Sequence, residues 1–391
     1  ALAAAQRITP DERQQLARLQ QAEAGLAAER LARLDGALAL LQRQPAAPPR
    51  TALAMAAANR PAAGNLHVHL LAGEQQLSLL LTGPRGSRLH QLPLPAASLA
   101  LQIGQLRDQL QQPASARSDD QTAMLPQARQ LHAALGRWID AAARDQGAQR
   151  LVLWLDGPLR YLPLGLLHDG RQHLAQRYQL VVAGATTATS ATAGQGRRLP
   201  PPSAANTLAA FGVTQALQGL PALPGVADEL CDIVAGPVLG LDTTTTGNTC
   251  GPGGAGRGPL AGRGRLNGHF TEASLATAAR GALPGQLLHI GTHFVLRPGQ
   301  VSKSWLLLGD GERLPMARLR SLPLGTPRLV TLSACETAVS DAGGGNGREV
   351  DGLAATLLDN GAQQVLASLW RVDDRATARF MQHFYRAYAR L

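Results

Sequence analysis

Two short apolar segments constrain the fold of this chain most, because each reads as a buried strand that ends beside a chemically active side chain. One covers residues 287–292 and precedes His293, and the other covers residues 329–333 and is followed two positions later by Cys335. Continuous apolar strands are typical of a parallel sheet covered on both faces, and such sheets bind ligands at the carboxyl ends of their strands. If the strands are neighbours, both side chains project from one edge. Their offset of 42 residues leaves room for a hairpin and a helix between the strands.

This pair has the residue types that nucleophilic catalysis requires. A thiol attacks a carbonyl as its thiolate, and a neighbouring imidazole can accept the thiol proton and later donate it to the leaving amine. The glycine-rich stretch 343–347 suits a flexible cleft wall, and backbone amides near Cys335 suit an oxyanion. Residue types alone leave a second interpretation open, in which Cys335 packs in the core and His293 is structural.

Apolar periodicity divides the chain into three parts. Residues 1–50 read as a helical arm or the end of a helical repeat, residues 51–195 as a first, structural half, and residues 205–391 as the half that holds the His/Cys pair. A Thr/Ala-rich and Pro-rich break over residues 186–202 separates the halves. Strands that alternate with helices predict an α/β fold with a mostly parallel sheet flanked by helices.

The individual elements follow from the same patterns. In the first half, alternating apolar residues from Gly64 predict a β-meander, followed by helices over 97–110 and 127–143 and strands over 151–155 and 178–183. In the second half we expect strands over 207–213, 286–292, 304–308, 328–333 and 364–369, and helices over 225–235 and 271–279, the latter capped by Thr271. The Gly-, Pro- and Arg-rich stretch 247–268 is interpreted as a loop.

Several motifs carry a family resemblance. His289-Ile-Gly-Thr-His293 and Leu329-Val-Thr-Leu-Ser-Ala-Cys335-Glu-Thr resemble the His and Cys motifs of CHAT domains, a caspase-like family often fused to tetratricopeptide repeats. The resemblance extends, in the expected order, over about residues 64–391. The other segments that are similar to the family are 156–163 and 223–225 upstream, and 351–354, 361–362, 365–374 and 384–385 downstream.

The resemblance implies a caspase/separase-like fold in two halves and a cysteine endopeptidase with Cys335 as nucleophile and His293 as base. It implies no metal and no organic cofactor. Relatives in the wider clan use the amide after the His in the oxyanion hole, which here belongs to Phe294, and its side chain is expected at the cleft edge. By similarity to separases, Asp374 and, less directly, Asp373 are predicted to line a pocket for a basic residue. The competing interpretation is that both acids cap the final helix.

The composition argues against several classes of function. The net charge is +10, with Lys303 as the only lysine, but the arginines are scattered and form no run, so nucleic acid is not expected as a partner. No apolar stretch is long enough to span a membrane, and the start of the chain lacks the pattern of a signal peptide. The three cysteines form no C-x-x-C pair, and their odd number without framework spacing favours a reducing, cytoplasmic setting. Cys231 is expected to pack in the core.

The resemblance implies two partners, namely a protein or peptide substrate and an activating protein bound through helical repeats upstream, and a role in bacterial signalling or defence. A different class of function also fits the sequence, namely a catalytically silent, protein-binding scaffold. The presence of both Cys335 and His293 favours the peptidase.

Overall fold

The structure is a computed structural model, and every residue it describes belongs to one compact unit, Arg60–Leu391. The described ranges are 60–111, 125–183, 207–241, 250–281, 285–295, 304–322, 324–333, 354, 356–368 and 372–390. The predicted helical arm at residues 1–50 and the predicted boundary between residues 195 and 205 lie outside these ranges, and so does Cys335.

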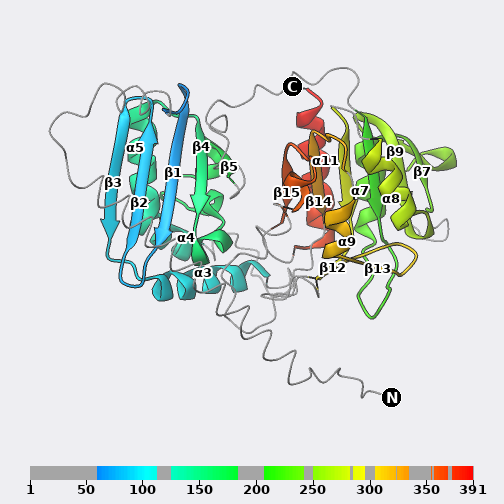
Figure 1. Cartoon of the computed structure of the whole chain (residues 1–391), viewed down its shortest axis with the longest axis horizontal. Helices are drawn as coiled ribbons and strands as arrows, with labels where there is room; N and C mark the ends of the chain where they lie inside the picture. The colour runs from blue at the N-terminus through cyan, green and yellow to red at the C-terminus, as the bar shows by residue number, and fades with distance from the viewer. Residues whose placement is uncertain are drawn as a thin grey trace, which may run out of the picture. The chain divides into compact units, whose positions relative to one another are not determined.

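The first half contains a mixed five-stranded sheet (Figure 1). Its strands are β1 (Asn65–Ala72), β2 (Leu77–Gly83), β3 (Gly86–Leu92), β4 (Arg150–Leu155) and β5 (Gln179–Val182). Their order is β3-β2-β1-β4-β5; β1, β2 and β3 form an antiparallel meander, and β4 and β5 extend the sheet in parallel with β1. The meander predicted from Gly64 is therefore confirmed.

Helices cover the apolar side of this sheet. They are α3 (Ala96–Gln111), α4 (Leu125–Leu131), a π-helical turn (His132–Gly136), α5 (Arg137–Gln146) and α6 (Leu174–Arg177). Leu66, Val68 and Leu70 alternate along β1 and are almost fully buried in one core with these helices. The two-residue period of the strand thus places Leu66, Val68 and Leu70 on the side that the helices cover.

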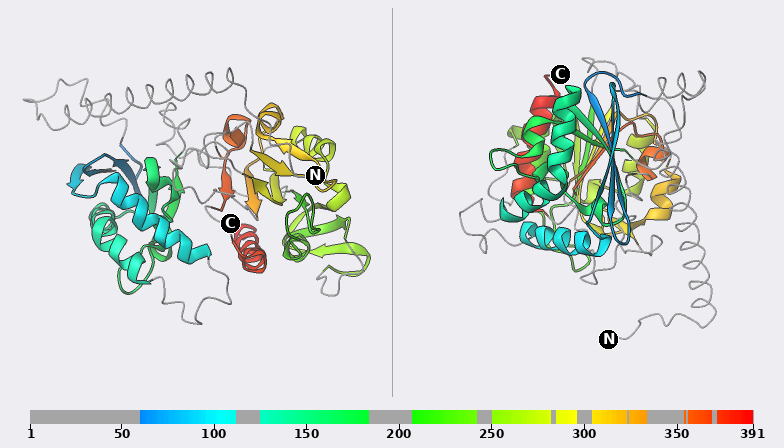
Figure 2. Two further views of the ribbon diagram at one scale, coloured as in Figure 1. Left: turned by 90° about the horizontal axis from the view of Figure 1, so that it is seen from below. Right: turned by 90° about the vertical axis from the view of Figure 1, so that its left-hand side faces the viewer.

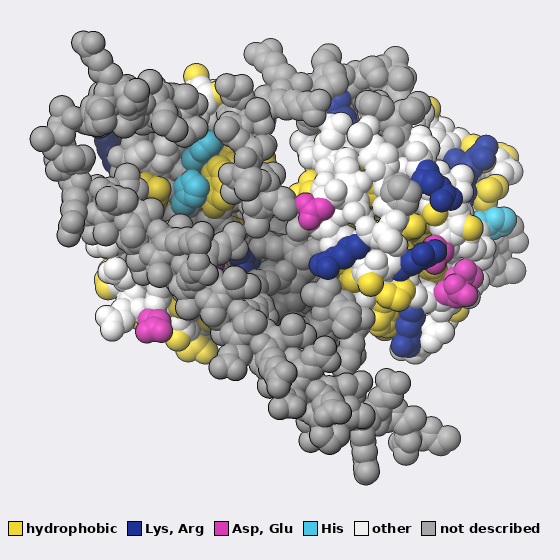
Figure 3. All heavy atoms as spheres, in the orientation of Figure 1, with side chains coloured by type: hydrophobic (Ala, Val, Ile, Leu, Met, Phe, Trp, Pro, Cys, Tyr) yellow, Lys and Arg dark blue, Asp and Glu magenta, His cyan; other side chains and the backbone are white. Residues whose placement is uncertain are grey.

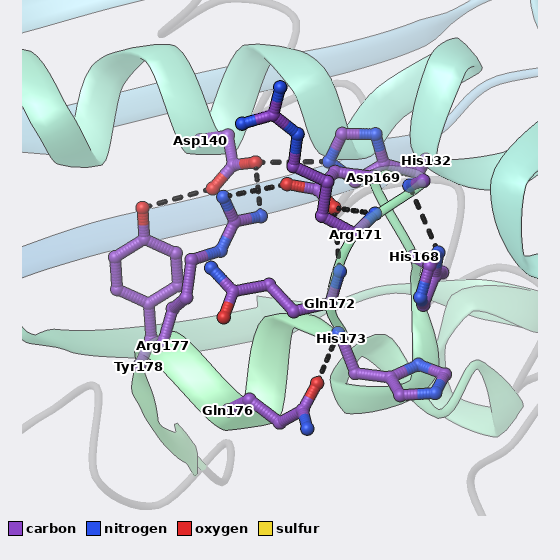
Figure 4. Close-up of polar contacts among 11 residues, drawn as sticks. His132, Asp140, His168, Asp169, Arg171, Gln172, His173, Gln176, Arg177 and Tyr178 are labelled. Carbon is purple, nitrogen blue, oxygen red and sulfur yellow. Dashed lines mark hydrogen bonds and ion pairs between the residues drawn. The ribbon is translucent and has the colours of Figure 1, made fainter.

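A buried carboxylate ties α5 to α6 and β5. Asp140 is 1 % exposed and accepts hydrogen bonds from the Tyr178 hydroxyl at 2.9 Å and the Arg177 guanidinium at 2.6 Å, while His132 Nε2 lies 3.0 Å from it. Arg177 also pairs with Asp169 at 3.0 Å. Figure 4 shows these side chains converging on Asp140. Because each charge has a partner, the cluster can remain in the interior at low free-energy cost.

The second half is built on a seven-stranded sheet. Its strands are β6 (Leu208–Gly212), β7 (Val234–Leu239), β8 (Ala255–Arg257), β9 (Leu260–Leu266), β10 (Leu287–Gly291), β14 (Leu329–Ser333) and β15 (Val365–Ala367). The order is β15-β14-β10-β6-β9-β7-β8, and all neighbours run parallel except β7 and β8. Between β10 and β14 the chain forms a small antiparallel sheet and a helix, as the spacing predicted: β11 (Phe294–Val295), β12 (Trp305–Leu307), β13 (Arg313–Pro315) and α9 (Met316–Ser321).

Helices cover both faces of this sheet, as Figure 2 shows. On one face, α7 (Gly225–Ile233) and α11 (Asp374–Tyr388) share a core with the strands, and on the other face α8 (Glu272–Arg280) and α9 do so. Thr271 caps α8 by accepting a hydrogen bond from the Ser274 amide, as predicted. The prediction of an α/β fold with a largely parallel sheet flanked by helices is therefore confirmed at this level. Among the residues described, no helix has the length and hydrophobicity to cross a membrane.

The interpretation of residues 247–268 as a loop is wrong, because this stretch contains β8 and β9. β9 lies between β6 and β7, inside the sheet. Positions 260, 262, 264 and 266 of β9 share one face of the strand. Two of them are glycines, Gly262 and Gly264, so the sequence shows no apolar period. Gly262 is required by close approach, since a Cβ there would lie 2.0 Å from the Leu208 carbonyl oxygen.

Replacing Gly262 with alanine is therefore expected to lower the free energy of unfolding by about 2 kcal/mol, because backbone must move to admit the methyl group. Urea denaturation measures this change. Gly268→Ala is the matched control, since a Cβ at Gly268 meets nothing within 4 Å. Equal stability of the two variants would contradict the packing described for β9.

Candidate active site

The strands that precede the two predicted catalytic residues are neighbours in the sheet. β10 and β14 pair in parallel with Gly291 opposite Ser333, and the Thr292 amide donates to the Ser333 carbonyl at 3.3 Å. His293 and Cys335 each follow their paired residue by two positions. The two strands are therefore neighbours, which is the condition that the sequence argument required. The register brings His293 and the carboxyl end of β14 to the same edge of the sheet, and Cys335 itself lies outside the described residues.

His293 is held in one orientation by backbone groups. Its ring is 2 % exposed, and Nε2 lies 2.8 Å from the carbonyl oxygen of Pro221, in the loop between β6 and α7. A carbonyl only accepts, so Nε2 carries the proton, and in the neutral ring Nδ1 is the nitrogen that can take up another. The His293 carbonyl in turn accepts from the Leu307 amide at 2.9 Å. The contact with Pro221 therefore assigns both tautomer and orientation to a candidate base.

The side chain of Phe294 is buried and is not open to this edge. Its side chain is 1 % exposed and packs in the core beneath α8 and α9, not at an open cleft edge as expected. Phe294 of β11 lies opposite Leu306 of β12. The hydrogen bond beside this pair runs from the Leu307 amide to the His293 carbonyl, so Phe294 and Leu306 form a non-hydrogen-bonded pair. The Phe294 amide consequently points away from β12. Its use in substrate binding stays a prediction.

Asp373 and Asp374 sit at the start of α11 and make different contacts. Asp373 caps the helix by accepting from the Ala376 amide at 2.8 Å. Asp374 is half-buried, and its carboxylate accepts from the Gly225 amide at 2.5 Å, at the first residue of α7. Burial raises the pKa of Asp374 to about 6, with the Gly225 amide opposing the shift and the acidic neighbours Glu229, Asp373 and Asp228 adding to it. Asp373 thus has the capping role of the competing interpretation, and the specificity pocket stays a prediction.

Asp374→Asn is expected to stabilise the protein above pH 6. A carboxyl whose pKa is higher in the folded than in the unfolded chain holds its proton more tightly when folded, so its contribution to stability falls as pH rises from about 4 to about 6. For a fully buried group the difference would be about 3 kcal/mol, and screening of this half-buried group reduces the expected gain to about 1 kcal/mol at pH 7.5.

The measurement is urea unfolding of both proteins at pH 4 and pH 7.5. Asparagine can still accept the Gly225 amide, so the variant isolates the charge. The two proteins should be equally stable at pH 4, and a gain of the same size at both pH values would contradict the burial of a charged Asp374.

A buried polar chain lies beneath the same two strands and centres on His289. Its Nε2 is 2.9 Å from Glu229 of α7, and both side chains are fully buried. Its Nδ1 is 3.2 Å from the Tyr385 hydroxyl, which donates to Thr331 of β14 at 2.8 Å. His289 is therefore a packed core residue and not a second base at the sheet edge. Glu229 was missed, although its position among the apolar residues 226, 230 and 233 of one helix face was a usable signal.

Cys231 does not pack as a free thiol, contrary to the prediction. It forms a disulfide with Cys250, with a Cα–Cα separation of 4.9 Å, which joins the buried side of α7 to the segment before β8. The sequence did not indicate this disulfide, because the stretch that contains Cys250, β8 and β9 was interpreted as a loop. With two of the three cysteines bonded, cysteine usage no longer favours a reducing compartment.

The remaining predictions concern cofactors and nucleic acid. In the part of the chain that the structure describes, no three His, Cys, Asp or Glu side chains are grouped as a metal site. On the face shown in Figure 3, basic side chains are spread among acidic, apolar and neutral ones. The absence of a cofactor and of a nucleic-acid partner remain predictions.

Fold and strand register together define an α/β protein with a histidine at the carboxyl edge of a parallel sheet and a cysteine two residues past the end of the adjacent strand. A family model described as CHAT domain matches residues 125–390. Because the match spans more than half of the chain, the protein belongs to the CHAT domain family, whose domain is of a caspase-like, peptidase type. The match begins at residue 125, later than the resemblance traced from residue 64. No curated protein matches the chain.

Proposed function

We propose that this protein is a cysteine endopeptidase that cleaves protein substrates with Cys335 and His293. The observation that supports the proposal is the in-register pairing of β10 with β14, whose last paired residues, Gly291 and Ser333, precede His293 and Cys335 by two positions each in the sequence. The orientation of His293 by the Pro221 carbonyl adds to it, because a general base is normally held by a third group.

In the proposed reaction, His293 Nδ1 accepts the proton of the Cys335 thiol, and the thiolate attacks the carbonyl carbon of the substrate peptide bond. The resulting oxyanion is stabilised by backbone amides near Cys335 and by the amide of Phe294. The C–N bond then breaks as His293 returns the proton to the leaving amine. Water, deprotonated by His293, hydrolyses the thioester and releases the second product.

Substrate choice is proposed to depend on Asp374, with a basic residue before the cleaved bond. The half-buried position and the negative charge above pH 6 support this role. Asp374→Lys tests it, because a protein that still prefers basic substrates after charge reversal does not use Asp374 for recognition. We further propose that a partner protein, bound through helical repeats upstream, regulates activity.

Cleavage of a mixed-sequence peptide library under mildly reducing conditions tests the function. The wild-type protein is expected to cut, and Cys335→Ala to leave the library intact. Equal and complete silence of the wild type and Cys335→Ala, with the full-length protein and its partners present, would favour the protein-binding scaffold instead.

A further inference from the structure

The Pro221 carbonyl that orients His293 belongs to a loop with its own internal order. Residues 213–224 leave the carboxyl end of β6, where the Val213 amide donates to the Gly291 carbonyl at 3.0 Å. The loop closes on itself, because the Leu223 amide donates to the Thr214 carbonyl at 3.1 Å. Pro221 lies inside this closed loop, two residues before Leu223. The position of Thr214, together with the Gln218 side chain that donates to the Gly311 carbonyl at 3.0 Å, therefore sets where the Pro221 carbonyl lies.

Thr214 is held in turn by one side chain, Asn267, at the end of β9. Asn267 Oδ1 accepts from the Thr214 amide at 2.9 Å, and the Asn267 amide group and the Thr214 hydroxyl are within 2.8–3.0 Å of each other. Asn267 Nδ2 also donates to the Gly240 carbonyl at 3.1 Å. The side chain thus fastens the segments that follow β6 and β7 to the end of β9 at the sheet edge where His293 lies.

The backbone at this position also suits asparagine. Asn267 is 6 % exposed and has a φ of 49°, in the left-handed region that only glycine and a few short polar residues adopt readily. One residue therefore meets two requirements: the turn needs a positive φ, and the loop needs an acceptor and a donor at defined points. A residue that served the turn alone would not need the amide.

We propose that Asn267 is a positioning residue for the candidate base: by holding Thr214 it fixes the loop that presents the Pro221 carbonyl to His293. The inference rests on the proposed function only in taking His293 as the base. Without the Asn267 amide, the loop loses its anchor at Thr214, and the bond from Pro221 no longer confines the imidazole to one tautomer and one orientation.

Two variants separate the side chain from the turn. Asn267→Gly keeps the freedom for a positive φ and removes the amide, so kcat is expected to fall about 10- to 100-fold with little change in KM, as for a displaced catalytic group. Asn267→Asp keeps an acceptor for Thr214 and tolerates the same φ, so it should recover most of the rate. Asn360→Ala is the control, since Asn360 also donates to a backbone carbonyl, that of Leu319, at 2.9 Å.

A second readout needs no turnover. In ¹⁵N-histidine NMR spectra of the whole chain, His293 should show a single tautomer protonated at Nε2 in the wild type, in Asn267→Asp and in Asn360→Ala, and a mixture of tautomers in Asn267→Gly. Failure of the wild type to cleave peptides would contradict the proposed function and leave this spectral test intact. Wild-type kcat together with an unchanged His293 signal in folded Asn267→Gly would overturn the inference. If that variant does not fold, Thr214→Val, which removes the hydroxyl bonded to Asn267, is held to the same criterion.

Discussion

Replacing His293 with alanine is expected to lower kcat/KM for a cleaved peptide by at least about 10³-fold. The variant leaves Cys335 without a base at the adjacent strand end, and it removes the proton donor for the leaving amine. Because catalytic groups that act as a unit are not additive, Cys335→Ala and the double variant should lose about as much as His293→Ala alone. Steady-state cleavage of one peptide identified in the library measures all three.

His383→Ala is the matched control for this experiment. His383 is exposed on α11, and its removal should leave kcat/KM unchanged. A loss in His293→Ala no greater than in His383→Ala, with the far-UV circular dichroism of both variants intact, would show that His293 does not take part in catalysis.

Replacing Glu229 with alanine is expected to lower the free energy of unfolding by about 3–5 kcal/mol, because it leaves His289 without its ionic partner in the interior. Both side chains are fully buried and 2.9 Å apart. The Tyr385 hydroxyl donates to Thr331, so His289 Nδ1 must donate to the Tyr385 oxygen. One further proton then lies between His289 Nε2 and Glu229. The Glu229→Ala variant leaves His289 Nε2 buried without this hydrogen-bond partner.

Urea denaturation measures this loss, and a double variant controls for it. Replacing Glu229 and His289 together with leucine removes both polar groups and should be less destabilising than Glu229→Ala, as for other buried ion pairs exchanged for apolar residues. A stability of Glu229→Ala within 1 kcal/mol of the wild type would mean that water reaches the pair in solution, in conflict with its burial here.

The strands around the candidate site were predictable because their signals are local. The runs at residues 287–292 and 329–333 are apolar enough to require a buried strand, and their offset is the same as the register offset between Gly291 and Ser333. The hairpin and α9 between them followed from the length of the connection. The helix start at Thr271 was visible for a similar reason, since a cap acts over only a few residues.

The remaining parts depend on contacts between residues far apart in sequence. β9 was missed because glycines occupy inward-facing positions of the strand and therefore show no apolar period in the sequence. Gly262 is nevertheless required there, because neighbouring backbone leaves no room for a side chain. The group that orients His293 is a backbone carbonyl, that of Pro221, and a carbonyl has no signature in a sequence. Glu229 and His289 pair across 60 positions only after α7 packs on the sheet. Such contacts depend on the tertiary fold, and a local sequence pattern does not reveal them.

The rate at which iodoacetamide alkylates Cys335 tests most directly whether His293 activates the thiol, because it requires neither a known substrate nor a partner. Peptide mapping by mass spectrometry follows Cys335 alone, since Cys231 and Cys250 are protected in their disulfide. At pH 7 the wild-type residue should react at least about tenfold faster than in His293→Ala, and the variant should regain its rate as pH rises and an ordinary thiol ionises. Equal rates in the two proteins at pH 7 would contradict a Cys335–His293 dyad.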